Sequence, residues 1–190
     1  MILNWFRRLC GVTPGKIVFK DSEFKAYLKD VASRSAFCTT HQYVQHGNTS
    51  VLLHSIAVAY YSYYLSWYFH LNFRERDLVR GALLHDYFLY DWHNSGEGHT
   101  LHAFTHARDA YTNAQKEFQL SRVEREVIKK HMFPLTLLPP LCREAVMVCL
   151  VDKGCSLYET FKRSPYSMLR AKFLPVLALA ECNDEPSDAC

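Results

Sequence analysis

The chain has 190 residues, long enough for a domain with a sizeable core, and 49% of them are hydrophobic, as is ordinary for globular proteins. Its 22 basic and 19 acidic residues give a net charge of +3. A charge this small argues against binding to a nucleic acid polymer or to a membrane surface. We expect a single domain over residues 1–182 and a disordered polar tail over residues 183–190.

The cysteines indicate a reducing compartment. There are seven of them, an odd number, and they form no Cys-x-x-Cys motif. The apolar run at the N-terminus is interrupted by Asn4, Arg7 and Arg8, so it is too short for the hydrophobic part of a secretory signal. We therefore expect reduced thiols in a cytoplasmic protein.

Hydrophobic spacing predicts a chain that is helical nearly throughout, without a convincing sheet. After a short extended piece at residues 16–19, we expect a helix over 22–32 and a loop over 38–47. A long helix, capped by residues 48–50, then runs to about residue 70. The later helices are expected over 78–86, 100–118, 121–131, 140–152, 155–163 and 166–180, with a loop at 94–98 and a capping box at 121–124.

One segment could be read as a membrane span. Residues 51–71 contain no charged side chain over 21 positions, which is long enough to cross a bilayer. However, the segment also contains His54, three serines and five tyrosines, which lower its hydrophobicity. Helices that are apolar on all sides also form the centre of soluble proteins, and we favour that interpretation.

The adjacent pair His85-Asp86 closes the predominantly apolar stretch 78–84. Burying both side chains is unfavourable unless something binds them, and a divalent metal accepts an imidazole nitrogen and a carboxylate oxygen together. Further donors of the same kind, each assigned to a different predicted helix, are His54, His106, His131 and Asp152. A helical bundle can direct such residues into one central cavity.

Four imidazoles and two carboxylates exceed one four-coordinate site and fit two ions about 3.5–4 Å apart, bridged by a carboxylate. We expect Asp86 to be the bridge. One ion would then be held by Asp86 with His54, His85 and Asp152, and the other by Asp86 with His106 and His131. Imidazole-rich sites favour Fe, Mn, Co, Ni or Zn. Individually, these residues have simpler explanations, since a lone buried histidine is more often a hydrogen-bonded core residue and Asp152 could pair with Lys153.

The ordered set resembles the HD-domain superfamily of metal-dependent phosphohydrolases over about residues 45–160. The strings that carry the resemblance are HSIAVA at His54, ALLHD at His85-Asp86, HARDA at His106, IKKHMFP at His131 and CLVDK at Asp152. The resemblance implies an all-α, HD-domain-like helical bundle. His106 and His131 resemble the binuclear branch, which includes HD-GYP-type phosphodiesterases and inositol-oxygenase-like di-iron enzymes. The chain differs from the HD-GYP type because Leu89 stands where those proteins have a lysine.

The resemblance leads to a phosphohydrolase that acts on a small phosphorylated substrate, with Asp86 central to catalysis. Lys153 could neutralise the phosphate, Asp91 could protonate the leaving group, and His46 and His102 could contact the substrate. Each also has a simpler role, as a helix-face charge, a solvated loop acid or a surface histidine. A di-iron oxygenase and a non-enzymatic module with structural metals are the alternative functions. The sequence does not indicate an oligomeric state.

Overall fold

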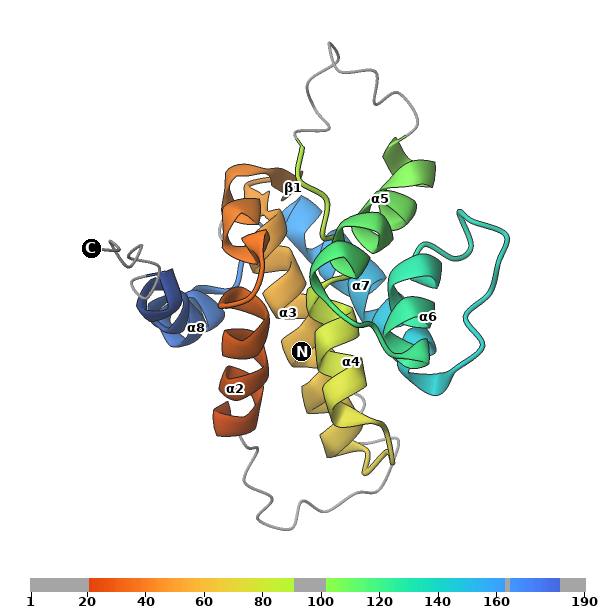
Figure 1. The fold of residues 1–190 in the computed structure, drawn as a ribbon, viewed down its shortest axis with the longest axis horizontal. Coiled ribbons are helices and arrows are strands. Elements are labelled where there is room, and N and C mark those ends of the chain that lie inside the picture. The colour runs from red at the N-terminus through yellow and green to blue at the C-terminus, as the bar shows by residue number, and fades with distance from the viewer. Residues whose placement is uncertain (1–20, 91–101, 163–164, 182–190) are drawn as a thin grey trace, which may run out of the picture.

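The computed structural model describes residues 21–90, 102–162 and 165–181 (Figure 1). The expected extended piece at 16–19, the loop at 94–98, Asp91 and the tail at 183–190 lie outside these residues. The elements are α2 (Asp21–Ala32), η1 (Ala36–Gln42), β1 (Val44–His46), β2 (Thr49–Ser50), α3 (Val51–Tyr68), α4 (Glu75–Leu83), α5 (His102–Glu117), α6 (Arg122–Lys130), α7 (Arg143–Phe161) and α8 (Ser167–Glu181). The fold is all-α apart from one small hairpin, as the sequence predicts.

Helix α3 is the centre of the molecule. It packs against α4 and α7, and α6 covers the far side of these two helices (Figure 1). Ser50 caps α3 by accepting a hydrogen bond from the backbone N–H of Leu53, as expected from the sequence. Nearly every side of the helix is buried, from Val51 to Ser66, which explains its apolar character without a bilayer. Among the described residues, no helix is long and apolar enough to cross a membrane.

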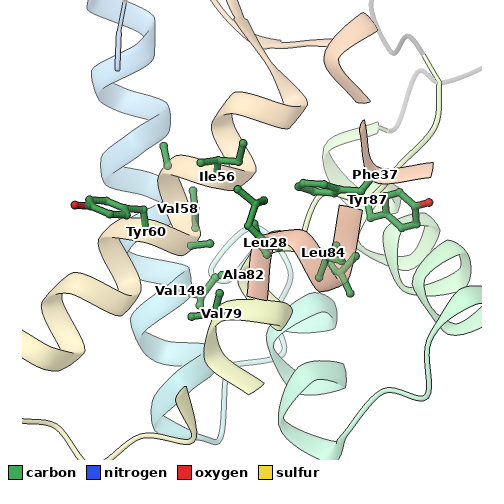
Figure 2. Packing of buried hydrophobic residues seen from close by; sticks show 14 of the residues in the cluster. Leu28, Phe37, Ile56, Val58, Tyr60, Val79, Ala82, Leu84, Tyr87 and Val148 are labelled. Atoms are coloured by element: carbon green, nitrogen blue, oxygen red, sulfur yellow. The ribbon is translucent and has the colours of Figure 1, made fainter. Parts of the chain in front are cut away.

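The core joins the first helices to the later ones. Leu28 of α2, Ile56 of α3, Val79 of α4 and Val148 of α7 are fully buried within one cluster (Figure 2). Burial of each such side chain contributes about 1.5–3 kcal/mol, so this cluster fixes how the helices are placed. The remaining helices extend it on two sides, with α8 packed on α2 and α5 packed on α6.

A buried ion pair joins α4 to α6. The Nε of Arg80 lies 3.1 Å from Oε1 of Glu124, and both side chains are almost completely enclosed. Glu124 also accepts from the backbone N–H of Ser121 in the capping box that starts α6, as the sequence predicts. This pair holds two helices together and serves below as a comparison for another buried glutamate.

The structure differs from the sequence prediction in the segment before α3. A loop was expected over residues 38–47, but the chain forms the helical turn η1 and the antiparallel hairpin β1–β2. Gly47 turns the hairpin with a φ of 56°, a conformation that a residue with a side chain rarely adopts. A Cβ atom there would lie 2.9 Å from the backbone oxygen of Glu159, so the hairpin rests directly on α7.

The predicted break near residues 152–155 is also wrong, because α7 is one continuous helix from Arg143 to Phe161. Asp152 therefore lies inside the helix rather than at its end. Gly154 lowers helix propensity at this point, but Val151 and Cys155 on either side of it are buried in the core. Tertiary packing outweighs the local preference here.

Candidate metal centre

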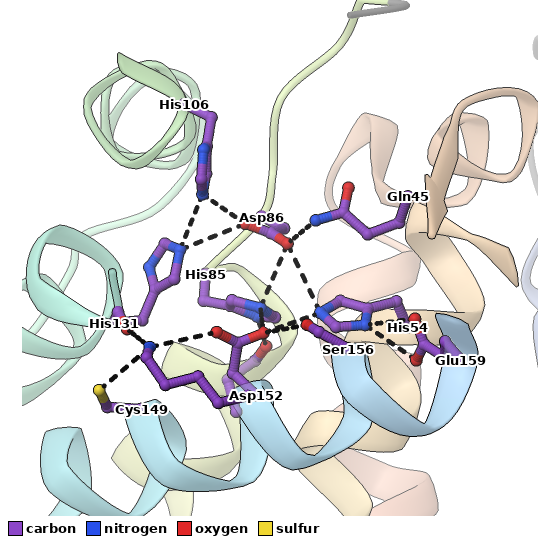
Figure 3. Close-up of polar contacts among 12 residues, drawn as sticks. Gln45, His54, His85, Asp86, His106, His131, Cys149, Asp152, Ser156 and Glu159 are labelled. Carbon is purple, nitrogen blue, oxygen red and sulfur yellow. Dashed lines mark hydrogen bonds and ion pairs between the residues drawn. The ribbon is translucent and has the colours of Figure 1, made fainter. Parts of the chain in front are cut away.

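His85 and Asp86 lie in the turn just after α4, which ends at Leu83. Both residues are buried, with exposed fractions of 0% and 1%. The turn directs their side chains toward α3, α6 and α7 rather than along the continuing face of α4 (Figure 3). Because the apolar stretch before them packs in the core, His85 and Asp86 also lie in the interior.

Asp86 connects the two halves of the cluster (Figure 3). Its Oδ2 lies 3.3 Å from Nε2 of His85 and 3.6 Å from Nε2 of His54. Its Oδ1 lies 3.3 Å from Nε2 of His106 and 3.4 Å from Nε2 of His131. The two carboxylate oxygens therefore face different pairs of histidines.

Asp152 joins the half that contains His54 and His85. Its Oδ1 lies 3.1 Å from Nε2 of His54 and 3.7 Å from Nε2 of His85, and it accepts a hydrogen bond from Ser156. The six predicted donors thus come together from α3, α5, α7, the turn after α4 and the end of α6. Two triads have all three donor atoms within 4.8 Å of one another: His54, His85 and Asp152, and His85, Asp86 and His131.

Backbone carbonyls orient two of the imidazole rings. Nδ1 of His85 lies 2.7 Å from the oxygen of Ala82, and Nδ1 of His131 lies 2.9 Å from the oxygen of Ile128. A carbonyl oxygen can only accept a hydrogen bond, so each Nδ1 carries a proton. In the neutral ring the lone pair is then on Nε2, which points into the cluster, as a metal ligand requires.

The donor set fits divalent metal ions. Nε2 of His106 and Nε2 of His131 lie 3.0 Å apart, and His131 has its proton on Nδ1. Nε2 of His85 and Oδ1 of Asp86 are buried without a hydrogen-bond partner among the described residues. Two donors bound about 2.1 Å from one ion are themselves about 3.0–3.4 Å apart, which is the spacing found here. A cation would satisfy atoms that the chain leaves without a hydrogen bond.

The protonation states show how strongly the cluster attracts positive charge. Burial opposes the charged imidazolium of His85, but Asp86 and Asp152 outweigh it and raise the pKa of His85 to about 9. Burial likewise opposes protonation of His54, yet hydrogen bonds to Asp152 and Glu159 raise its pKa well above 6.5. Burial favours the neutral acid of Asp86, but the surrounding histidines hold its pKa well below the usual range. The carboxylates of Asp86 and Asp152 therefore stay ionised, and their buried negative charge favours binding of cations.

A cavity of about 290 Å³ opens beside the cluster. This is the lower end of the size range of small-molecule sites. Among the predicted substrate contacts, His46 and Lys153 line it. The other described residues that line the cavity are Gln45, Asp86, His106, His131, Met132, Leu135, Asp152 and Ser156.

Lys153 has three partners within the protein, the most distant of which is Oδ2 of Asp152 at 3.8 Å from its Nζ. Its Nζ donates to the backbone oxygen of His131 at 2.7 Å and lies 3.4 Å from Sγ of Cys149. It therefore holds the end of α6 against α7 in addition to facing the cavity. His46 is half-buried, and burial, followed by the nearby His54, lowers its pKa. His102 begins α5, but its side chain and Asp91 lie outside the described residues, so their predicted roles stay predictions.

Sequence reasoning missed two buried polar residues at the centre. Gln45 of β1 donates from Nε2 to Oδ2 of Asp86 at 2.6 Å. Glu159 of α7 faces Nδ1 of His54 at 2.9 Å. Seven residues separate Asp152 from Glu159, which is about two helical turns, so the two share a face of α7. This spacing was available in the sequence but was hidden by the break expected near residue 152.

The family model of the HD domain matches residues 51–154, more than half of the chain. The chain belongs to the HD-domain family. Neither the curated proteins nor the solved structures give a significant match. The HD-domain match covers all six predicted donors, and HD domains are in general metal-dependent hydrolases of the phosphohydrolase superfamily.

Proposed function

We propose that this HD-domain protein hydrolyses a phosphate ester of a small molecule, with two divalent transition-metal ions held by the six donors. The observation that carries the proposal is the position of Asp86, whose two oxygens face separate histidine pairs. Metal ions at such a site would supply Lewis acidity and would lower the pKa of a coordinated water. Asp86 would keep the two halves of the centre together.

The charge of the centre supports two ions rather than one. Asp86, Asp152 and Glu159 are three buried carboxylates, and the nearest described ammonium group, Lys153, is partly exposed. A single divalent ion would leave one net negative charge among the three carboxylates, which Lys153 or a protonated histidine would have to offset. Two ions would balance them and leave positive charge for an anionic substrate.

The cavity supports an anionic substrate of small size. We assign Lys153 to contact the phosphate, because its side chain lines the cavity and its third ammonium partner, Asp152, lies at 3.8 Å, beyond hydrogen-bond distance. His46 and Ser156, which also line the cavity, are assigned to position the rest of the substrate. Met132 and Leu135 add an apolar part to the wall of the cavity.

The test is a screen of phosphorylated metabolites with the metal-free chain reconstituted with Mn²⁺ or Co²⁺. We expect metal-dependent phosphate or phosphomonoester release from a small substrate.

Lys153→Met should raise KM about tenfold or more, because a charge-assisted hydrogen bond contributes about 1.5–3 kcal/mol. Arg108→Met, which removes an exposed cation outside the cavity, should leave KM unchanged. Substrate-dependent oxygen consumption by the iron-loaded protein without phosphate release would instead establish the oxygenase.

A further inference from the structure

Glu159 is a buried carboxylate that the six predicted donors do not include. It lies on α7 with an exposed fraction of 1%. Its Oε1 and Oε2 are 2.9 Å and 3.0 Å from Nδ1 of His54. Burying an ionised carboxylate is strongly unfavourable without compensation, so its pairing with His54 calls for a role.

The carboxylate fixes the tautomer of His54. With Nδ1 donating to Glu159, the Nε2 atom faces Asp152 at 3.1 Å and Asp86 at 3.6 Å. This is the arrangement in which imidazole binds a metal through Nε2. His85 and His131 are oriented by neutral carbonyls instead, so among these three rings His54 alone has a charged partner outside the donor set. A carboxylate also raises the basicity of the imidazole, which strengthens it as a ligand.

We propose that Glu159 is a positioning residue that sets the affinity of the ion bound by His54 and leaves the other ion unaffected. The inference rests on the proposed function, because it assumes that the six donors hold metal. Glu159 itself is not among the residues that line the cavity. Its effect would pass through the orientation and basicity of a single imidazole ring.

Two structural features lie close to Glu159, the hairpin turn and Tyr166. The hairpin turn at Gly47 presses against its backbone oxygen. Tyr166 is buried, and its hydroxyl has no hydrogen-bond partner among the described residues; burial, followed by the influence of Cys155 and Glu159, raises its pKa far above 10. Tyr166 adopts a φ of 63°, an unfavourable conformation for a residue with a side chain. The contact at Gly47 fixes the backbone of Glu159, and with it the point from which the carboxylate reaches His54.

The competing explanation is that Glu159 and His54 form an ion pair that only stabilises the fold. Glu159→Gln distinguishes the positioning role from the purely stabilising ion pair. Glutamine keeps the shape of the side chain, and its amide oxygen can still accept from Nδ1 of His54, but the negative charge is removed. We expect the dissociation constant of one Co²⁺ ion to rise about 10–100-fold, and that of the second to stay within about threefold. The measurement is calorimetric titration of the metal-free full chain with Co²⁺, together with the visible spectrum of the bound ion.

Glu124→Gln is the matched control. Glu124 is equally buried and paired with Arg80, but it lies outside the centre. This variant should lower the melting temperature and leave both Co²⁺ affinities unchanged. A double-mutant cycle adds a second check: in a His54→Ala background, Glu159→Gln should change Co²⁺ affinity by less than about twofold.

The possible outcomes separate this inference from the function on which it rests. Absence of Co²⁺ binding by the wild-type chain would contradict the proposed function itself. Tight binding by the wild type and unchanged binding by Glu159→Gln would overturn only the role of Glu159, as would equal weakening by Glu124→Gln. If Glu159→Gln does not fold, Glu159→Asp replaces it. That variant keeps the buried charge but withdraws the oxygens by about 1.5 Å, and unchanged Co²⁺ affinity there would also overturn the inference.

Discussion

Asp86 contacts every histidine of the candidate centre. Its two oxygens lie between 3.3 and 3.6 Å from four Nε2 atoms, and Gln45 donates a hydrogen bond to Oδ2. No other side chain among the described residues joins both histidine pairs in this way. The loss of either oxygen should therefore affect one half of the centre directly and the other half through the displaced carboxylate.

Asp86→Asn replaces one oxygen by an NH₂ group, which is a donor and cannot bind a metal ion. We expect the metal content to fall from about two ions per chain to one or none, with at least about a 100-fold loss of hydrolysis. Elemental analysis of the purified variant and a phosphate-release assay measure the two effects. Wild-type metal content in this variant would exclude Asp86 as the bridge.

Metal binding should also become tighter as the pH rises. In the metal-free protein the pKa of His85 is raised to about 9 and that of His54 lies well above 6.5, so both rings are protonated at neutral pH. A metal accepts only the neutral ring, and two protons must leave. Between about pH 6.5 and the raised pKa values, affinity should increase about tenfold per pH unit for each proton released.

Above about pH 9 the contribution of His85 should level off, because its ring is then already neutral without metal. Co²⁺ titrations across this range, in two buffers with different enthalpies of protonation, count the protons directly. A dissociation constant that does not change with pH would show that the rings are neutral before metal arrives. The carboxylates do not contribute in this window, since the surrounding histidines hold the pKa of Asp86 well below its usual range despite its burial.

Short capping motifs in the sequence predict the starts of helices correctly, whereas the prediction fails where tertiary packing determines the secondary structure. Ser50 and the Ser121–Glu124 capping box correctly placed the starts of α3 and α6, because caps depend on a few neighbouring residues. The hairpin was missed because β1 and β2 have only three and two residues, too few for an alternating pattern. Its turn rests on Glu159 of α7, which lies 112 positions after Gly47 in the chain (159 − 47).

The hairpin turn gives a prediction about stability. Gly47→Ala places a Cβ 2.9 Å from the oxygen of Glu159 and forces alanine into a φ of 56°. The left-handed conformation alone costs about 1–2 kcal/mol, which corresponds to a loss of about 2–8 °C in melting temperature for a chain of this size. The shift of β1 should also loosen the hydrogen bond from Gln45 to Asp86. Thermal unfolding followed by circular dichroism measures the effect.

Gly154→Ala is the matched control for Gly47→Ala, because it should change the stability in the opposite direction. Gly154 lies inside α7, and a Cβ there would meet no atom within 4 Å. Alanine in a helix interior is more favourable than glycine by about 0.5–1 kcal/mol, so this variant should be more stable than the wild type. If both substitutions changed the melting temperature in the same direction, the contact between the hairpin and α7 would not be what requires glycine at position 47.

For the whole molecule, the order of donors along the chain was more informative than any local spacing. His54, His106 and His131 lie on separate elements, and no short motif links them; the match of the whole set to a known family made the cluster predictable. Gln45 and Glu159 could not be found in this way, because each acts on one ligand through a contact that exists only in the folded chain. A sequence pattern predicted the six side chains that cluster in the fold, whereas tertiary structure determines what orients them.

The same arrangement would couple metal binding to the stability of the entire fold. The donors come from α3, α5, α7, the turn after α4 and the end of α6, so an ion held among them joins elements that no single secondary structure connects. A ligand at 100 times its dissociation constant stabilises the folded state by about 2.7 kcal/mol. For a chain of this length, each kcal/mol corresponds to about 2–4 °C, so removal of one such ion should lower the melting temperature by about 5–10 °C.

Calorimetry with and without a chelator measures this difference. Asp86→Asn should lose most of the chelator-dependent shift, while Glu124→Gln should melt earlier but keep it. If the chelator leaves the wild-type melting temperature unchanged, the six side chains do not hold metal in the purified protein.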